Sequence, residues 1–301
     1  MKLAVLVRDG QYRLGVGTEQ GIVDVAAALA AEPSAANQRV CTSVMDVIAG
    51  GSEAVQALDS LIRKLPLDQS PGYVIGEEAA EWGPCVPYPG KIICVGLNYR
   101  KHAEETRSPI PEFPILFNKF SNALTGHKRD IAVPKVTREL DYEAELAIVI
   151  GKRAKEVARE EALDCVFGYC AVNDLSARDL QRRTSQWMLG KSCDGFCPLG
   201  PYLVTADEVG DPNNLAIRTL VNGEVRQNSN TSDMIFRCDE IVSYISQHMT
   251  LMPGDVILTG TPEGVVLGLP REKRVYLKPG DEVTVEIEKL GRLTNRFIAE
   301  S

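Results

Sequence analysis

Residues 140–151, LDYEAELAIVIG, impose the strictest constraint on how this chain can fold. Asp141, Glu143 and Glu145 alternate with apolar or aromatic residues, and an unbroken apolar run follows them. Alternation with a period of two indicates a β-strand, in which successive side chains point to opposite faces. We therefore expect all three carboxylates on one face of a strand that becomes fully buried at its far end.

Most of the chain after residue 90 has the pattern of β-strands, rich in β-branched and aromatic residues. The segments with this pattern are KIICVG, PILFNKF, AELAIVI, VFGYCAVND, YLVTADEV, LAIRTLV, DVILTG and EVTVEI. Asn222-Gly223 predicts a hairpin turn, and IEKLGRLTNRFI predicts a second hairpin. In this part of the chain, helical spacing is confined to the surroundings of His102, to residues 176–183 and to CDEIVSYISQHM. Because strands do not alternate with helices, we expect a strand-rich α+β fold and no doubly wound parallel sheet.

The first part of the chain predicts a small α+β unit. KLAVLV and YRLGVG read as strands joined at Asp9-Gly10, and SVMDVIAGGSEAVQALDSLIRKL has helical spacing interrupted by two glycines. GPCVPYPG, residues 83–90, combines three prolines with two glycines and predicts a linker. We expect a small N-terminal domain over residues 1–85 and a catalytic domain over residues 89–301.

Composition excludes several classes of function. The 301 residues carry a net charge of −8 without a block of Lys or Arg, which argues against nucleic-acid binding. The apolar run in MKLAVLVRDG ends at Arg8, too early for a signal-peptide core or a membrane span. We therefore expect a cytoplasmic protein without membrane insertion. CDGFC could be a redox or zinc pair, but with no second pair at zinc spacing the eight cysteines are better explained as reduced packing residues.

The acidic strand face needs compensation. Two carboxylates about 5 Å apart repel by roughly 3 kcal/mol at an effective dielectric constant of about 20. A solvated edge strand is one explanation, since such charges also discourage aggregation. Asp174 offers another, because it follows the apolar run VFGYCAVN at the point where that strand ends. Glu143, Glu145 and Asp174 would form an all-oxygen site that suits Mg²⁺, Mn²⁺ or Ca²⁺ and does not suit Zn²⁺.

Two further elements can carry chemistry. His102 and Glu105 are three residues apart, so on a helical turn the carboxylate can orient the imidazole; a surface helix pair is the alternative. Lys191 lies in a stretch of otherwise low charge, either as a surface residue or in a cleft where it could polarise a carbonyl. His127 looks like a loop residue, and His248 ends a helical segment.

These motifs occur together in a fixed order: G-x-N-Y-x-x-H-x-x-E, D-Y-E-x-E-L, N-D-x-[ST]-x-R-D, G-K-x-x-D-x-x-x-P-x-G-P, and then PGDVILTGTPEGV. In this combination the chain resembles the fumarylacetoacetate hydrolase family over about residues 89–301. The resemblance implies a mixed β-sandwich roll, usually a homodimer, with one Mg²⁺ or Mn²⁺ per subunit. It also implies the roles of the site residues: metal ligands Glu143, Glu145 and Asp174, catalytic residues His102, Glu105 and Lys191, and substrate-binding residues Arg178 and Thr261.

The resemblance also bears on the substrate. The animal fumarylacetoacetate enzyme has an additional aspartate ligand just before its histidine, whereas no acid lies between Gly90 and Lys101 here. The pattern is more similar to the acylpyruvase and oxaloacetate decarboxylase branch. With three carboxylates, a bound divalent cation would leave a charge near −1 and open positions for a 2-oxo acid.

We therefore expect metal-dependent C–C hydrolysis of an acylpyruvate or fumarylpyruvate type of substrate. In that reaction His102 would activate water. Decarboxylation of oxaloacetate and isomerisation of 2-hydroxyhepta-2,4-diene-1,7-dioate are alternatives within the same chemistry. A binding or scaffold protein with an idle site is the alternative from a different class.

Overall fold

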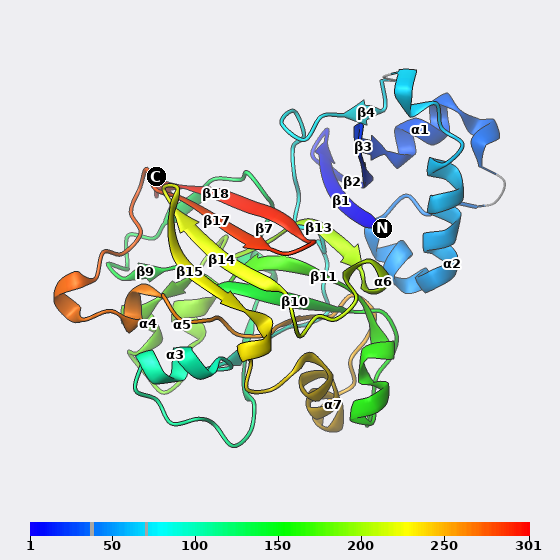
Figure 1. The fold of residues 1–301 in the computed structure, drawn as a ribbon. Helices are drawn as coiled ribbons and strands as arrows, with labels where there is room; N and C mark the ends of the chain where they lie inside the picture. The colour runs from blue at the N-terminus through cyan, green and yellow to red at the C-terminus, as the bar shows by residue number, and fades with distance from the viewer. Residues whose placement is uncertain (37–38, 70–71) are drawn as a thin grey trace.

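The computed structural model describes residues 1–36, 39–69 and 72–301. Figure 1 shows a small N-terminal unit, coloured blue to cyan, beside a larger strand-rich body. The body carries short helices at its margins, whereas the strands cross its centre. The expected strand-rich α+β class is confirmed.

The largest sheet has eleven strands and runs through both parts of the molecule. Ten of its strands follow in the order β4 (Val74–Ile75), β3 (Gly21–Asp24), β2 (Gln11–Thr18), β1 (Lys2–Arg8), β13 (Cys197–Thr205), β11 (Val166–Asn173), β10 (Ala144–Ile150), β16 (Val256–Leu258), β5 (Ile92–Gly96) and β6 (Ile115–Lys119). The eleventh, β7 (Leu124–Thr125), pairs with β13 in parallel. β16 and β5 are also parallel, so the sheet is mixed.

A second sheet packs against the first. Its five strands follow in the order β15 (Glu224–Asn230), β14 (Ala216–Val221), β17 (Glu282–Ile287), β18 (Gly291–Ala299) and β8 (Ile131–Val133), and a small pair joins β12 (Ser176–Ala177) to β9 (Leu140–Asp141). Leu146 and Ile148 of β10 share a hydrophobic cluster with Ile217 and Val285 of the second sheet. The two sheets therefore form the expected sandwich, with β10 buried along its whole length.

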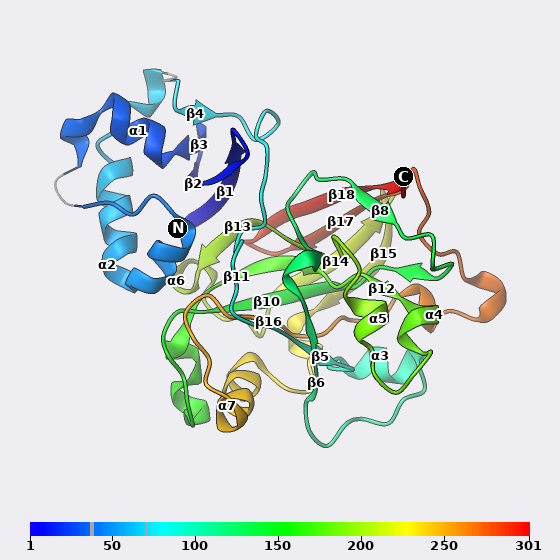
Figure 2. The same cartoon turned by 180° about the vertical axis from the view of Figure 1, so that it is seen from behind.

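Within the described residues, seven α-helices lie around the sheets. They are α1 (Val25–Ala31), α2 (Val44–Ile62), α3 (Arg100–Glu105), α4 (Arg178–Gln181), α5 (Met188–Lys191), α6 (Ala206–Val209) and α7 (Cys238–His248). Short 3-10 helices are η1 (Pro33–Ala35), η2 (Leu67–Gln69), η3 (Ser121–Ala123), η4 (Arg159–Cys165), η5 (Thr231–Asp233), η6 (Val266–Gly268) and η7 (Arg271–Lys273). Figure 2 shows that α3, α4 and α5 gather at one end of the body. None of the helices in the described residues is long and apolar enough to span a bilayer.

The N-terminal unit follows its sequence pattern closely. β1 and β2 form the expected hairpin, with Asp9 and Gly10 both at positive φ in the turn. The expected interruption of α2 lies at Gly51, where φ is 57° and ψ is −139°. β1 also pairs with β13 of the body, with Leu3 opposite Leu203, so the main sheet continues across the linker. The division into two domains near residue 85 stays a prediction.

The acidic segment differs from its prediction. A single strand over residues 140–150 is wrong, because Asp141 belongs to β9 and pairs with β12, whereas β10 begins only at Ala144. Between them the backbone N–H of Glu143 donates to Asn173 Oδ1 (3.0 Å) and that of Ala144 donates to Gln227 Oε1 (2.9 Å). Side chains thus replace strand partners at this point. Glu143 and Glu145 share a face as expected, but Asp141 lies outside their cluster.

Of the other predicted elements, one strand ends earlier than expected and two hairpins are confirmed. YLVTADEV is only partly a strand, because β13 ends at Thr205 and the acidic residues after it open α6. Carboxylates favour the first turn of a helix, where they face free N–H groups. The hairpin at Asn222-Gly223 and the C-terminal hairpin of β17 and β18 are confirmed.

Candidate active site

Three carboxylates meet where β10 begins and β11 ends. The two strands are antiparallel with Ala144 opposite Asn173, so Glu143 and Asp174 lie next to each other across the ladder, and Glu145 lies one pleat further along β10. All three side chains are buried, and one oxygen from each lies within 4.8 Å of the others. The structure therefore brings together the three residues that the sequence suggested as metal ligands.

Two buried lysines face this cluster. Lys191 Nζ at the end of α5 lies 2.6 Å from Glu143 Oε2 and 2.7 Å from Asp174 Oδ2. Lys119 at the end of β6 pairs with Asp174 Oδ1 and donates to the carbonyl oxygen of Leu175 at 3.2 Å. Lys119 was not among the predicted site residues, although a lone lysine inside the apolar strand pattern PILFNKF was a usable signal.

Arg178 links the cluster to Asp141. Its Nε donates to Asp141 Oδ2 (2.9 Å), its Nη2 lies 2.7 Å from Glu143 Oε1, and its Nη1 donates to Gln181 Oε1 (3.0 Å). The side chain lines the cavity but is only 2 % exposed, and each of its nitrogens already contacts a protein group. A direct contact between Arg178 and a substrate stays a prediction.

Burial and charge divide the carboxylates. Burial would raise the pKa of Glu143, but Lys191 and Arg178 outweigh it and lower that pKa to about 2. Burial raises the pKa of Glu145 well above its usual range, and repulsion from Asp174 and Glu143 adds to the effect. Burial would lower the pKa of Lys191, but Asp174 and Glu143 raise it instead. Among the three clustered carboxylates, Glu145 is therefore the one with the least compensation from buried cations.

The charge of the whole cluster corrects the expectation for a loaded site. Three of the four buried carboxylates, Asp141, Glu143 and Asp174, pair with the three buried cations. Glu145 is the fourth, and with all four ionised the cluster carries one more negative than positive charge. With a divalent cation the site would be near +1, whereas the expected −1 counted only the three carboxylates and the cation. That count left out Asp141 and all three cationic side chains. Among the described residues no Lys or Arg forms an ion pair with Glu145, and its Oε2 only accepts from the Gly260 N–H (2.8 Å). Three converging carboxylate oxygens with an uncompensated charge fit a hard divalent cation.

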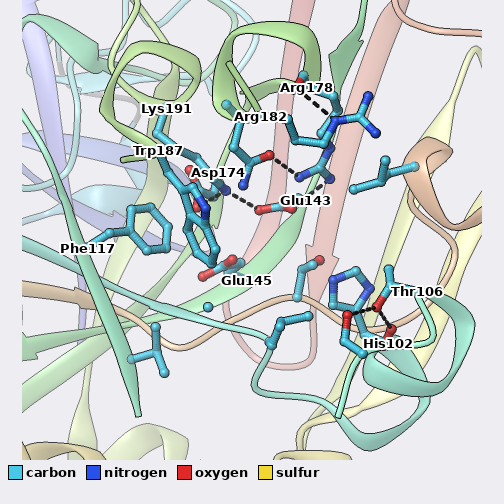
Figure 3. A pocket seen from close by; sticks show the side chains of 17 residues that line it. His102, Thr106, Phe117, Glu143, Glu145, Asp174, Arg178, Arg182, Trp187 and Lys191 are labelled. Carbon is cyan, nitrogen blue, oxygen red and sulfur yellow. Dashed lines mark hydrogen bonds and ion pairs between the residues drawn. The ribbon is translucent and has the colours of Figure 1, made fainter. Parts of the chain in front are cut away.

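The carboxylates open into a cavity of about 190 Å³. Figure 3 shows Lys191 and Trp187 on one side of this cavity and His102 on the other, with Glu145 between them. Phe117 packs below the lysine, with its ring centre 4.9 Å from Nζ. The cavity is smaller than the roughly 300–1,000 Å³ typical for drug-sized ligands, so its size suits a small substrate.

His102 and Glu105 form a hydrogen-bonded pair on α3, as their spacing predicted. Nδ1 of His102 lies 2.8 Å from Glu105 Oε1, so the carboxylate acts as the acceptor for an Nδ1–H and leaves Nε2 for exchange with a ligand. Glu105 Oε2 accepts from the backbone N–H of Gly264 (3.0 Å). The loop after β16 therefore holds the carboxylate that orients the imidazole.

Thr261 lies in the wall of the cavity, but its hydroxyl is already engaged. It donates to the carbonyl oxygen of Ala144 (2.9 Å) and accepts from Gln227 Nε2 (2.9 Å). Gln227 was not predicted either; it is buried on β15 and binds the start of β10 as well as the Thr261 turn. Its sequence context, EVRQNSN, gave no signal because it reads as an ordinary polar strand.

The remaining histidines and the cysteines lie outside this arrangement. His127 accepts at Nδ1 from the Thr294 N–H (3.0 Å) and packs edge-on against Trp82. His248 contacts the carbonyl oxygen of Tyr244 in the last turn of α7, as its position predicted. All eight cysteines are free.

The chain is similar to known proteins both in sequence and in fold. Residues 91–298 match the family model described as "Fumarylacetoacetate (FAA) hydrolase C-terminal". A mitochondrial oxaloacetate tautomerase of Bos taurus is 46 % identical over 248 residues, which cover 82 % of this chain and 78 % of that protein.

Two solved structures cover this chain and their own chains fully. One is the maleylpyruvate hydrolase of Sphingobium, in complex with manganese(II) and pyruvate (TM-score 0.79, 32 % identity). The other is the fumarylacetoacetate hydrolase of Exiguobacterium antarcticum (TM-score 0.77, 34 % identity). The sandwich fold expected from the sequence is thus the fold of this family. With its buried Glu/Glu/Asp metal site, the chain belongs to the fumarylacetoacetate hydrolase family and is an enzyme of that family.

Proposed function

We propose that this enzyme interconverts the keto and enol forms of a small 2-oxo dicarboxylic acid, with oxaloacetate as the first substrate to test. One observation carries the proposal: the buried cluster would be near +1 with a divalent cation and opens into a cavity of about 190 Å³. Such a site suits a small dianion. The 46 % identity to an oxaloacetate tautomerase supports the choice of substrate.

The resident metal would be Mg²⁺ or Mn²⁺, one per subunit, held by Glu143, Glu145 and Asp174. The choice follows from the three carboxylate oxygens, and the manganese(II) in the maleylpyruvate hydrolase supports it. When bound, the cation would supply a Lewis acid that stabilises negative charge on the 2-oxo oxygen.

The proton transfers fall to His102. In the proposed reaction Nε2 removes a proton from C3 of the keto form, which yields the enolate and an imidazolium. The same nitrogen then returns the proton to the oxygen on C2, which gives the enol. Glu105, whose Oε1 lies 2.8 Å from Nδ1, stabilises the imidazolium between the two transfers. No atom is gained or lost, as a tautomerisation requires.

Two cationic side chains would hold the substrate. Lys191 has three N–H groups, of which two point to Glu143 and Asp174, so one remains for a substrate oxygen. Arg182 also lines the cavity and is 47 % exposed. Its Nη2 pairs with Glu139 and its Nε donates to the carbonyl oxygen of Arg178 (3.2 Å), which leaves Nη1. Arg182 is therefore better placed than Arg178 to bind a distal carboxylate, while Thr261 shapes the wall.

Hydrolysis of a C–C bond in an acylpyruvate or fumarylpyruvate is the second candidate. The His102–Glu105 pair favours it, because the same Nε2 could take a proton from water and direct the hydroxide to the C4 carbonyl. The third N–H of Lys191 would then stabilise the oxyanion. Decarboxylation of oxaloacetate would give the same enolate of pyruvate, whereas isomerisation of a 2-hydroxy dienedioate would need only the transfer of protons. The homodimer and the cytoplasmic location stay predictions.

Turnover measured on metal-stripped protein tests the proposal. The enol of oxaloacetate would be followed by its ultraviolet absorbance, before and after addition of Mg²⁺ or Mn²⁺, alongside acetylpyruvate and a dienedioate. The variant Glu143→Ala with the same added metal is the matched control, because free metal ions also promote the reaction. We expect metal-dependent acceleration by wild type alone. Full activity after treatment with EDTA would refute the metal requirement, and no turnover of any substrate would favour the scaffold alternative.

A further inference from the structure

Asp141 is fully buried beside the metal ligands without belonging to their cluster. Its two oxygens accept four hydrogen bonds. Oδ1 accepts from the N–H groups of Tyr142 and Val266 (both 2.9 Å), and Oδ2 accepts from Leu267 N–H (3.0 Å) and Arg178 Nε (2.9 Å). A carboxylate with this many donors is fixed in place, and it fixes the donors in turn.

Two of those donors belong to the loop over residues 260–268. This loop contacts both the carboxylate cluster and the His102–Glu105 pair. At one end the Gly260 N–H binds the metal ligand Glu145 (2.8 Å). In its middle the Gly264 N–H binds Glu105 Oε2 (3.0 Å), and the Gly264 carbonyl accepts from Tyr142 Oη (2.9 Å). At the other end Asp141 binds two successive N–H groups. The loop is therefore anchored on both sides of the point at which it contacts Glu105.

Packing leaves the loop little freedom to adjust. A Cβ on Gly268 would lie 2.4–2.8 Å from the carboxyl group of Glu105. A Cβ on Gly264 would lie 2.2 Å from the carbonyl oxygen of Arg226, and its φ is +100°. The position of the loop backbone thus determines where the carboxylate of Glu105 can lie.

We propose that Asp141 is a positioning residue, which holds the loop so that Gly264 directs Glu105, and through it His102, toward the metal site. Arg178 completes the link, because it contacts both Asp141 and Glu143. Asp141 would therefore set the geometry of proton transfer without binding metal or substrate. The effect on turnover rests on the proposed function of His102, whereas the effect on the loop does not.

The variant Asp141→Asn tests this role, because its amide places N–H donors against donors of the loop or of Arg178. We expect kcat to fall by about 10- to 10²-fold, as small misplacements of catalytic groups do. KM and the calorimetric affinity for Mn²⁺ should stay within about threefold, since ligand and substrate contacts remain. Hydrogen exchange at Gly264, Val266 and Leu267 should accelerate by at least about tenfold. The ¹⁵N spectrum of His102 should change from a single Nδ1–H tautomer to a mixture.

The matched control is Asp24→Asn. Asp24 is likewise a buried carboxylate that accepts from a backbone N–H (Ala27, 3.1 Å) and faces an arginine (Arg13, 3.8 Å), but it lies in the N-terminal unit. It should leave kcat, the His102 spectrum and the exchange of the loop unchanged. Wild-type exchange and turnover in Asp141→Asn would overturn the proposal. Lost protection with wild-type turnover and an unchanged His102 spectrum would also overturn it.

A second variant keeps the proposal testable if Asp141→Asn does not fold. Gly268→Ala pushes Glu105 away at the other end of the same link and leaves Asp141 untouched. We expect the same loss in kcat and the same mixture of His102 tautomers, with slow exchange retained at Val266 and Leu267. Wild-type kcat and tautomer in Gly268→Ala would refute the link between loop and imidazole. If instead Glu105→Gln has wild-type turnover, the proposed function of the pair fails, while the exchange data still report on Asp141.

Discussion

Glu143, Glu145 and Asp174 lie at the ends of central strands, whereas His102 and Glu105 lie on a helix of six residues at the margin. The carboxylates are held by sheet pairing and by buried lysines. The histidine pair depends on one hydrogen bond from a loop. The charge of this site thus lies in its core, whereas the orientation of the proposed base depends on the backbone segment that contacts Glu105.

Loss of a metal ligand should have the largest effect. We expect Glu143→Ala and Asp174→Ala to abolish measurable Mn²⁺ binding by calorimetric titration, and with it all metal-dependent turnover, because two carboxylates form a poorer chelate. Asp141→Ala should lose much less affinity, since Asp141 lies outside the cluster. Equal losses at all three positions would show that the ligands are assigned wrongly.

The next largest effect should come from loss of His102, and it should distinguish the histidine pair from the carboxylate cluster. We expect His102→Gln to lower tautomerisation of oxaloacetate and hydrolysis of an acylpyruvate by about 10²- to 10⁴-fold, because both need a base. Decarboxylation moves no proton as its bond breaks, so it should change far less, and Mn²⁺ affinity should barely change. Lys101→Gln, on the same helix but 61 % exposed at its side chain, is the control. Equal losses in all reactions with metal still bound would mean that the pair serves a step common to them.

Lys119 provides a test of the buried ion pairs that hold the carboxylate cluster. Removal of one partner from a buried ion pair costs about 3–5 kcal/mol. Without metal, the melting temperature of Lys119→Met should therefore lie well below that of wild type. Added Mn²⁺ should raise its melting temperature more than that of wild type, because the cation restores the missing positive charge. Lys91→Met removes a half-exposed partner of Asp255 and should show a smaller loss that metal does not repair. Equal metal-induced shifts in both variants would contradict this account.

His127 lies outside both the carboxylate cluster and the histidine pair, and it should have the smallest effect, on the pH dependence of stability. Burial, and to a lesser degree Lys128, lowers its pKa from 6.5 to about 4 in the folded protein. The unfolded chain therefore binds the extra proton between these values, so stability should fall as pH drops through this window and be retained above it. The loss amounts to on the order of 3 kcal/mol at most. Urea unfolding of wild type and His127→Gln across pH 4–7 would measure it, and identical pH profiles would contradict it.

Local patterns in the sequence predicted much of the fold. Alternation located β10, and Asn222-Gly223 and Asp9-Gly10 located hairpins, because each depends on neighbours in sequence. The break at Tyr142 could not be foreseen. It depends on Asn173 and Gln227, which arrive from distant strands and replace strand partners of the backbone. Pairing of β1 with β13 is equally non-local, because the sequence of neither strand specifies its partner.

The site shows the same division. Spacing alone predicted that Glu105 lies against His102, and the strand ends predicted the carboxylate cluster. Lys119 was missed because a lysine next to apolar residues is usually exposed, and only the fold shows that this one meets Asp174. The expected charge of the loaded site counted the three carboxylates alone. The motifs contain Lys191 and Arg178, but only the fold shows that both pair with Glu143.

The pairing of β1 with β13 has a consequence for how this enzyme can be dissected. All nine residues of β13 are buried, and Lys2, Leu3 and Ala4 pair with Val204, Leu203 and Tyr202 along its edge. A recombinant fragment that starts at residue 89 would expose this apolar edge to solvent, and such edges recruit strands from other molecules. The N-terminal unit thus covers this edge of the sheet through β1. A shortened enzyme would need a charged residue or a proline on β13 to remain free of aggregates.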